Sequence, residues 1–464
     1  MSVNFMDTTR NRKVYLVSLG CDKNRVDGEV MIGNLRNAGF TVTNDPSEAQ
    51  AIIVNTCGFI RDAVQESIDL VLELAAYKSD GSCNGLIIVG CMSERYRGEI
   101  QESIPEADAI LGVKEYDRIA EVVSGLIGSP GVDLPEVGLP DSSDNGASVG
   151  SNPFLSRMAA RSDDAIPHVA YVKISEGCDN HCTYCTIPSI RGAYTSRSME
   201  HILEECKQLV AAGVCEIVLV AQDTALYGTD NYGEKRLPEL LRKIAALSSG
   251  IWIRLMYAYP EHITTELIQT MAEIPQICKY VDMPIQHSED SVLARMGRSS
   301  SRAALTTLIA ELREKIPDIA IRTTVMVGFP GETTDDFKNL YRFVQEIKFD
   351  RMGAFPYSRE EGTPAATMPQ QLKPETKQAR LERIMALQQE IHFAKQAALV
   401  GETLDVIIDL QDENGEYIAR TQHDAFEVDA VVYVESNEIL THGQFCKVKI
   451  TSANQYDLRG HGLT

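Results

Sequence analysis

The sequence lacks any apolar run as long as the ~18 residues that a membrane-spanning helix needs. Its first residues, MSVNFMDTTRNRK, also lack the apolar core of a signal peptide. We therefore expect a cytoplasmic protein that does not enter a membrane. Basic residues are scarce as well, because 44 Lys and Arg stand against 66 Asp and Glu, a net charge of −22. Such a balance disfavours a protein whose main partner is a phosphate backbone.

The 464 residues are enough for about three domains of ordinary size. With 44% hydrophobic and 24% charged residues, the composition is that of a globular protein. The sequence also contains eleven cysteines. Structural disulfides rarely persist in a reducing compartment, so these cysteines predict metal or redox chemistry.

Three cysteines stand close together in the stretch Cys178-Asp-Asn-His-Cys182-Thr-Tyr-Cys185. Three thiolates on one loop can hold three irons of a cubane iron–sulfur cluster and leave the fourth iron open to a substrate. Zinc is the alternative, but zinc sites normally use CxxC pairs with two further Cys or His ligands. The wider first gap fits that arrangement badly, even with His181 nearby. The spacing therefore favours a cluster, without identifying what its open iron binds.

The first segment, 11–128, alternates short apolar runs with helical patterns, which is typical of βαβ units on an open parallel sheet. The predicted strands are Val14–Leu19, Ala51–Asn55, Leu86–Val89 and Ala109–Leu111. The first three lead directly into Cys21, Cys57 and Cys91, and the carboxyl ends of parallel strands meet at one edge of a sheet. A single such cysteine is usually a buried small hydrophobe. Three at equivalent positions predict a shared ligand site.

Residues 129–164 are rich in Gly, Pro, Ser and Asp and predict a linker. The next segment, 165–399, repeats a strand and a helix six times and ends in a long helix at about Pro374–Leu399. Its predicted strands are His168–Ser175, Glu216–Ala221, Ile251–Tyr257, Tyr280–Ile285, Ala320–Val327 and Arg351–Tyr357. Six units predict a partial (βα)6 barrel with its active face at the carboxyl ends of the strands. The Cys178–Cys185 loop follows the first strand, so it belongs to that face.

Residues 400–464 alternate β-branched and polar residues around the hairpin signal Asn414-Gly415. They predict a small all-β barrel of the size of an oligonucleotide-binding module. From residue 401 onwards this segment has 12 Asp and Glu against 4 Lys and Arg, a net of −8. The excess acidity would repel phosphates; it suits a basic partner, or it is simply a solvated surface. The chain as a whole is thus predicted to be α/β with a terminal β-barrel.

Taken together, these motifs resemble those of the methylthiotransferases of the radical S-adenosylmethionine (SAM) superfamily, over nearly the whole chain. The resemblance implies a [4Fe–4S] cluster on Cys178, Cys182 and Cys185 whose open iron binds SAM, with Tyr184 packing near the adenine. It also implies that the turn Val327-Gly-Phe-Pro-Gly331-Glu332 approaches the nucleoside. The cofactor-binding residues expected in that turn are Gly328, Gly331 and Glu332.

The same resemblance implies a second [4Fe–4S] cluster on Cys21, Cys57 and Cys91, and a C-terminal TRAM domain that presents a macromolecular substrate. The likeness is strongest to the RimO branch, on stretches such as LGCDKNRVDGE, KISEGCDNHCTYCTIPSIRG and YPEHIT. That branch implies a transferase that methylthiolates the β-carbon of an aspartate on the small-subunit ribosomal protein S-twelve. Asp22, Gly28 and Phe426 depart from the family pattern, which has Pro, Ser and Pro there. None of the three is a cluster ligand.

In that family an electron entering the first cluster cleaves SAM, and the resulting 5′-deoxyadenosyl radical abstracts a hydrogen from the substrate. The second cluster holds the sulfur, and another SAM supplies the methyl group. The resemblance therefore implies three partners: S-twelve or the small ribosomal subunit, a sulfur source, and an electron donor such as flavodoxin or ferredoxin.

Several polar residues on the expected active face have two interpretations. Gln222, Asp223, Gln286 and His287 end predicted strands, and each could serve the site or simply be a hydrogen-bonded strand end. Arg191 and Arg197 follow the cysteine loop, and arginines there could bind a carboxylate, although surface arginines are commoner.

Two alternative functions remain open at this point. A tRNA adenosine methylthiotransferase would share the fold and the clusters, but the acidic C-terminal segment disfavours RNA as the direct substrate. A non-catalytic iron–sulfur scaffold or redox sensor would carry the clusters without forming 5′-deoxyadenosine.

Overall fold

The computed structural model describes residues 12–81, 83–128 and 168–463. The predicted linker, 129–164, lies outside the described residues. The described chain forms two compact units, and Ser189–Arg191 belongs to the N-terminal one. The second unit contains the rest of the chain from residue 168. No helix in the described part of the chain has the length and apolar character that crossing a bilayer requires.

The N-terminal unit is built on a five-stranded sheet with the order β2-β1-β3-β4-β5, and every neighbouring pair runs parallel. The strands are β1 (Lys13–Ser18), β2 (Thr41–Val42), β3 (Ala51–Thr56), β4 (Gly85–Gly90) and β5 (Ala109–Leu111). The four strands predicted for this segment are all present, and only the two-residue β2 lacked a prediction. The open parallel sheet is confirmed.

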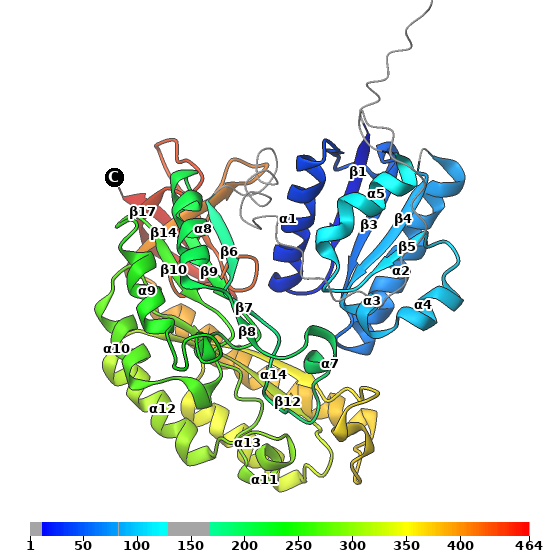
Figure 1. Ribbon diagram of the computed structural model, residues 1–464. Coiled ribbons are helices and arrows are strands. Elements are labelled where there is room, and N and C mark those ends of the chain that lie inside the picture. Colours follow the sequence, from blue (N-terminus) through cyan, green and yellow to red (C-terminus); the bar gives the residue numbers. More distant parts are fainter. Residues whose placement is uncertain (1–11, 82, 129–167, 464) are drawn as a thin grey trace, which may run out of the picture. The chain divides into compact units, whose positions relative to one another are not determined.

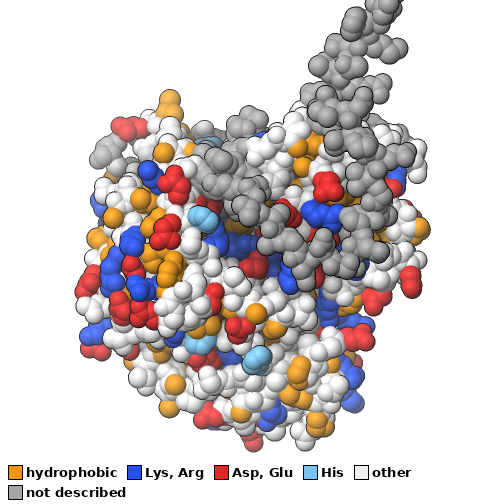
Figure 2. Space-filling view, in the orientation of Figure 1, with side chains coloured by type: hydrophobic (Ala, Val, Ile, Leu, Met, Phe, Trp, Pro, Cys, Tyr) orange, Lys and Arg blue, Asp and Glu red, His pale blue; other side chains and the backbone are white. Residues whose placement is uncertain are grey.

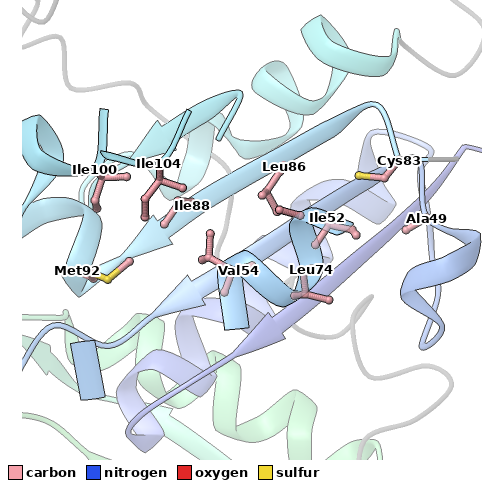
Figure 3. Packing of buried hydrophobic residues seen from close by; sticks show 12 residues of the cluster. Ala49, Ile52, Val54, Leu74, Cys83, Leu86, Ile88, Met92, Ile100 and Ile104 are labelled. Carbon is pink, nitrogen blue, oxygen red and sulfur yellow. The ribbon is translucent and has the colours of Figure 1, made fainter. Parts of the chain in front are cut away.

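Helices cover both faces of this sheet (Figure 1). They are α1 (Asp22–Asn37), α2 (Arg61–Asp80), α3 (Cys91–Arg95), α4 (Arg97–Ser103) and α5 (Ile119–Ile127). Figure 3 shows the core on the α2 face, where Ile52 and Val54 of β3 pack with Leu74. Ala51 and Ile53 belong to the core on the α1 and α5 face. Because β3 is buried on both faces, its sequence is a continuous apolar run.

The second unit begins with six parallel strands in sequential order. They are β6 (Val169–Lys173), β9 (Glu216–Val220), β10 (Trp252–Leu255), β11 (Tyr280–Asp282), β12 (Ala320–Val327) and β13 (Arg351–Pro356). The ladder of the first three strands joins that of the last three where Ala258 donates to Asp282 O at 2.8 Å. Each strand lies within its predicted range, which confirms the partial barrel.

Helices lie along the outside of this curved sheet (Figure 1). They are α8 (Met199–Ala211), α9 (Leu237–Ala245), α10 (Thr265–Glu273), α11 (Asp290–Arg295), α12 (Arg302–Lys315) and α13 (Thr334–Ile347). The long helix α14 (Pro374–Ala398) packs against β13. Between β6 and α8 the chain forms a short hairpin, β7 (Ser175–Glu176) and β8 (Thr195–Ser196), that encloses the cysteine loop and α7 (Ile187–Arg191).

The chain ends in a closed five-stranded barrel with the order β14-β15-β16-β18-β17. Its strands are β14 (Thr403–Gln411), β15 (Tyr417–Thr421), β16 (Val432–Glu435), β17 (Phe445–Asn454) and β18 (Asp457–Leu463). Gly415, at φ +84°, lies in the turn between β14 and β15, where the Asn-Gly signal predicted a hairpin. The small all-β barrel is therefore confirmed.

Buried charges join the amino ends of the central strands to this barrel. Glu216, the first residue of β9, accepts from Arg254 of β10 at 2.6 Å and from Arg420 of β15 at 2.7 Å. Arg420 also donates to Asp409 of β14 at 2.6 Å, and that carboxylate lies 2.8 Å from Nε2 of His168. All five side chains are buried, so the barrel is fixed to the end of the strands opposite the cysteine loop.

Candidate functional site

The N-terminal cysteines lie at the carboxyl ends of neighbouring strands, as predicted. Cys21 follows β1 and precedes α1, Cys57 follows β3, and Cys91 follows β4. Glycines let the three chain segments approach closely: a Cβ at Gly20 would lie 2.9 Å from Cβ of Cys57, and one at Gly58 would lie 2.7 Å from the backbone of Cys91. The three thiols are thus brought together, with Cys21 exposed, Cys57 half-buried and Cys91 buried.

Asn24 of α1 ties these strand ends to one another. Its side-chain amide donates to Leu19 O and to Thr56 O, both at 2.9 Å, and its Oδ1 lies 3.7 Å from Sγ of Cys91. Asn24 had no role predicted from the sequence. Its only signal there was its place two residues after the Cys21-Asp pair, inside the stretch LGCDKNRVDGE.

Arg191 adds positive charge to this group of thiols. Its guanidinium donates to Asp27 and to Asn24, both at 2.6 Å, and lies 3.1 Å from Sγ of Cys91. Burial raises the pKa of Cys91 to about 11, and Arg191 opposes that rise. Because metal binding requires thiolates, loading such a site releases protons. The carboxylate that Arg191 binds in this structure is therefore that of Asp27, a residue of the protein itself.

The second cysteine loop is held by backbone bonds on both sides. Cys178 N donates to Gly192 O at 3.1 Å, and Thr183 N donates to Met296 O at 3.0 Å. Cys178 and Cys182 are buried and Cys185 is half-buried. Burial raises the pKa of Cys178 to about 11 and that of Cys185 to about 12, and the neighbouring thiols add to both shifts. The three thiols therefore form one electrostatic group at the predicted face of the partial barrel.

Asp223, which follows β9, is hydrogen-bonded to this loop. Its fully buried carboxylate accepts from Asn180 of the loop at 3.1 Å and lies 2.6 Å from Nδ1 of His262. It also accepts from Tyr259 N at 3.4 Å. The strand-end position of Asp223 was predicted, whereas His262 had no assigned role. The contact joins residues 39 positions apart, and its only local signal was the place of His262 in the stretch YPEHIT.

Tyr259, which is half-buried, and the buried Arg298 form a pair beside the loop. The Tyr259 hydroxyl lies 2.6 Å from Sγ of Cys182, and the Arg298 guanidinium lies 3.9 Å from the centre of the Tyr259 ring. Two bonds of 2.9 Å join Arg298 to the carboxylate of Glu261. Nη1 of Arg298 is buried and has no hydrogen-bond partner among the described residues. Neither Tyr259 nor Arg298 had a role predicted from the sequence, although Tyr259 begins the stretch YPEHIT.

Tyr184 and the glycine-rich turn come together in the structure. Tyr184 packs on Phe329 of the turn, edge to face with 6.4 Å between ring centres. Around them lies an apolar cluster made of Val292, Met296, Tyr357, Ala365, Met326 and Met368. This gives the cysteine loop an apolar wall next to its third thiol.

In the turn after β12, backbone N–H groups donate hydrogen bonds to other groups of the protein. Glu332 accepts from the backbone N–H groups of Gly328 and Phe329, and from Arg380 of α14 at 2.7 Å. Gly331 N donates to Gln370 O at 3.0 Å. A Cβ at Gly328 would lie 2.5 Å from Cγ of Lys377, so the missing side chain makes room for α14. Glu332 therefore shapes the turn.

Two strand ends on this face have unusual backbone geometry. Tyr257 after β10 and Gln286 after β11 have φ of 57° and 65°, a conformation that non-glycine residues adopt mainly where the surrounding structure holds them. His287 is fully buried, and burial lowers its pKa to about 3. Gln222 donates to Glu176 at 2.6 Å. Oε1 of Gln222 and Nε2 of His287 are buried without a hydrogen-bond partner among the described residues, so both interpretations of these two side chains stay predictions.

The two groups of thiols fit iron–sulfur clusters. All eleven cysteines are free thiols. Among the described residues, no three His, Cys, Asp or Glu side chains converge on a single point as for a mononuclear metal site. Cluster ligands need no such convergence, because each thiolate binds a different iron. A cleft of about 680 Å3 lies between α14, β13 and the barrel, and none of the residues that line it is a cysteine. The candidate functional site is therefore located by the two groups of thiols.

Three family models match the chain in the order of its parts. The model described as "Uncharacterized protein family UPF0004" matches residues 13–112, "Radical SAM superfamily" matches 172–344, and "TRAM domain" matches 400–462. Among solved structures, a radical S-adenosylmethionine methyltransferase, TsrM, from Kitasatospora setae covers 81% of this chain and 89% of its own, with a TM-score of 0.54 and 14% identity. That likeness concerns the fold alone.

Curated relatives cover almost the entire chain. A "Ribosomal protein uS12 methylthiotransferase RimO" from Lachnoclostridium phytofermentans is 46% identical over 97% of this chain and 99% of its own. The protein of the same name from Clostridium kluyveri is 44% identical over 97% of each chain. Since both similarities extend from the N-terminal sheet to the terminal barrel, the chain belongs to the RimO family of radical SAM methylthiotransferases.

Proposed function

We propose that this protein methylthiolates ribosomal protein uS12, on the β-carbon of an aspartate. The observation that carries the proposal is the pair of three-thiol groups, each formed by the cysteines that the motifs singled out. Relatives that carry the uS12 methylthiotransferase name match the chain nearly end to end. Together these favour an enzyme over a passive iron–sulfur scaffold.

Cys178, Cys182 and Cys185 would hold the cluster that binds SAM, which when bound supplies the reductive cleavage that forms the substrate-activating radical. The protein's own part is to hold and enclose it. Asp223 fixes the loop through Asn180. Tyr184 and Phe329 present apolar surface next to the thiols, which suits an adenine and excludes water. The unpaired Nη1 of Arg298 is a buried donor suited to a carboxylate.

Cys21, Cys57 and Cys91 would hold a second cluster that supplies the sulfur of the methylthio group. Asn24 keeps their three chain segments together, and Arg191 offsets the negative charge that thiolates bring into a partly buried site. An electron donor such as flavodoxin or ferredoxin and a source of sulfur complete the set of partners.

The choice of uS12 over tRNA draws on the charge of the terminal barrel. Its segment is acidic by −8, and RNA affinity depends on Lys and Arg contacts with phosphates. Ribosomal proteins bind RNA and are therefore basic, so an acidic presenting surface is complementary to them.

The test is an anaerobic incubation of the reconstituted enzyme with SAM and reductant, with either uS12 or tRNA as substrate. We expect 5′-deoxyadenosine and a methylthio mass gain on uS12. Cys182→Ala should abolish 5′-deoxyadenosine, whereas Cys57→Ala should still form it but transfer no sulfur. Cys83→Ala, which removes a buried thiol outside both groups, is the matched control and should behave as the wild type. Methylthiolated tRNA with unmodified uS12 would contradict the proposal.

A further inference from the structure

The hydroxyl of Tyr259 is directed at one of the three thiols of the central loop. It lies 2.6 Å from Sγ of Cys182, although 77 residues separate the two in sequence. Tyr259 follows β10, whereas Cys182 lies in the loop after β6. Cys178 has the backbone N–H and the side-chain amide of Asn180 as its hydrogen-bonding neighbours, and Cys185 has Ile187 N. Cys182 instead has phenol hydroxyls as its neighbours, those of Tyr259 and Tyr184. This difference makes Cys182 the asymmetric member of the three thiols.

The surroundings hold the Tyr259 ring in this position. Arg298 lies over the ring at 3.9 Å, and Glu261 fixes the guanidinium through two bonds. The His262 ring is stacked on Tyr259 at 5.8 Å and is itself held by Asp223. Because these contacts already restrict the rotamers of Tyr259, its hydroxyl points at Cys182 without a further loss of side-chain entropy.

We propose that Tyr259 donates a hydrogen bond to the Cys182 thiolate and thereby raises the reduction potential of the SAM-binding cluster. The inference rests on the proposed function, because it requires Cys182 to be an iron ligand. A thiolate has no proton to give, so the phenol must be the donor. A donated bond stabilises negative charge on the sulfur, and the reduced cluster carries more of that charge than the oxidised one.

Arg298 strengthens this donor. A cation over the face of a phenol ring withdraws electron density and makes the hydroxyl a better hydrogen-bond donor. Tyr259 thus acts through Cys182 and is a positioning residue, and Arg298 acts through Tyr259. The pair makes a strongly reducing cluster easier to reduce before SAM is cleaved.

The test measures the potential of this cluster alone. In the full-length chain carrying Cys21→Ala, Cys57→Ala and Cys91→Ala, only the central cluster remains, and a redox titration followed by electron paramagnetic resonance gives its midpoint. Adding Tyr259→Phe should shift the midpoint to more negative values. The ratio of reduced to oxidised cluster at a fixed potential should fall roughly tenfold, equivalent to ~59 mV for one electron.

Two further variants distinguish an effect of the hydrogen bond on the midpoint potential from a general disturbance of the structure around the cluster. Tyr194→Phe removes a hydroxyl that donates to Asp223 O at 3.1 Å in the same region but does not touch sulfur, and should leave the midpoint unchanged. Replacement of Tyr259 by 3-fluorotyrosine keeps the ring, strengthens the donor and should shift the midpoint to more positive values. That variant also tests the idea if Tyr259→Phe binds iron poorly.

An unchanged midpoint in Tyr259→Phe, or shifts of the same sign in both Tyr259 variants, would overturn the inference while leaving the proposed function intact. Iron and sulfide counts on the triple variant distinguish the remaining case. If that chain assembles no cluster, the assignment of Cys178, Cys182 and Cys185 fails, and this inference fails with it.

Discussion

Asn24 shows how one side chain can define a three-thiol site. Its amide bridges the ends of β1 and β3 through Leu19 O and Thr56 O, and its oxygen faces Cys91 after β4. Asn55 and Thr56 add side-chain bonds between neighbouring strand ends, to Ser18 at 3.1 Å and to Val89 O at 2.6 Å. Without this amide, two carbonyls would lose a donor in a buried region.

We predict that Asn24→Ala weakens the N-terminal cluster without affecting the central one. Two carbonyls lose their donor, which costs about 1–3 kcal/mol for each buried group left unsatisfied. Iron and labile sulfide should be counted in a chain that also carries Cys178→Ala, Cys182→Ala and Cys185→Ala, so that only the N-terminal cluster contributes. Asn37→Ala, at the exposed end of the same helix, should retain full iron. Equal iron in both variants would mean that Asn24 does not organise the site.

At the scale of elements, the turn between β12 and α13 depends on two glycines with positive φ angles. Gly328 has φ +74° and Gly331 has φ +77°, a region that other residues adopt at a cost. Gly328 also faces Lys377 of α14, so the same position sets how closely the helix approaches the turn.

We predict that Gly328→Ala lowers SAM affinity and thermal stability together. The φ alone costs about 1–2 kcal/mol, and the added Cβ would displace Lys377. Gly233→Ala is the matched control, because it has φ +76° with no atom near the added Cβ. Equilibrium binding of SAM to the reconstituted enzyme and melting curves check the prediction. If Gly233→Ala loses as much stability as Gly328→Ala and both keep SAM affinity, the helix contact contributes nothing.

The elements were predictable from sequence to a large extent, because buried parallel strands leave continuous apolar runs. The runs ending at Cys21, Cys57 and Cys91 located both the strands and the shared edge. The details that hold the sites together were not predictable in the same way. The bond of Tyr259 to Cys182 and the use of Glu332 inside its own turn are tertiary contacts between polar residues, and no periodicity marks such contacts.

At the scale of the molecule, the acidity of the terminal barrel has two origins. Asp409, Asp424 and Asp429 belong to the barrel segment, but all three are nearly fully buried and face Arg420, Arg351 and Arg322 respectively. These carboxylates are used in fixing the barrel to the central strands. Over the face of the molecule seen in Figure 2, acidic and basic side chains are interspersed. Without these three carboxylates and the buried Arg420, the segment from residue 401 still has nine Asp and Glu against three Lys and Arg, so its surface is acidic, but less so than the net charge of the segment.

Glu216 is the centre of the buried network and makes barrel docking sensitive to acid. Burial by itself would raise its pKa, but Arg254 and Arg420 outweigh burial and lower the pKa from 4.5 to about 2. A carboxyl group whose pKa is lower in the folded chain than in the unfolded chain stabilises the fold fully at pH values above its unfolded pKa. That contribution is therefore complete above pH 4.5 and is lost as the pH falls from 4.5 towards 2.

Glu216→Gln should consequently destabilise the second unit near neutral pH and make its stability less dependent on pH between 4.5 and 2. Removing one partner of a buried ion pair costs about 3–5 kcal/mol, because Arg254 and Arg420 remain buried with less compensation. The only tryptophan, Trp252 on β10, reports directly on docking, since its ring packs edge to face on Phe445 of β17 at 5.0 Å. Urea unfolding followed by its fluorescence at several pH values measures both effects. Glu314→Gln, which removes an exposed carboxylate of α12, should change neither, and equal acid sensitivity in wild type and Glu216→Gln would assign the acid response to other groups.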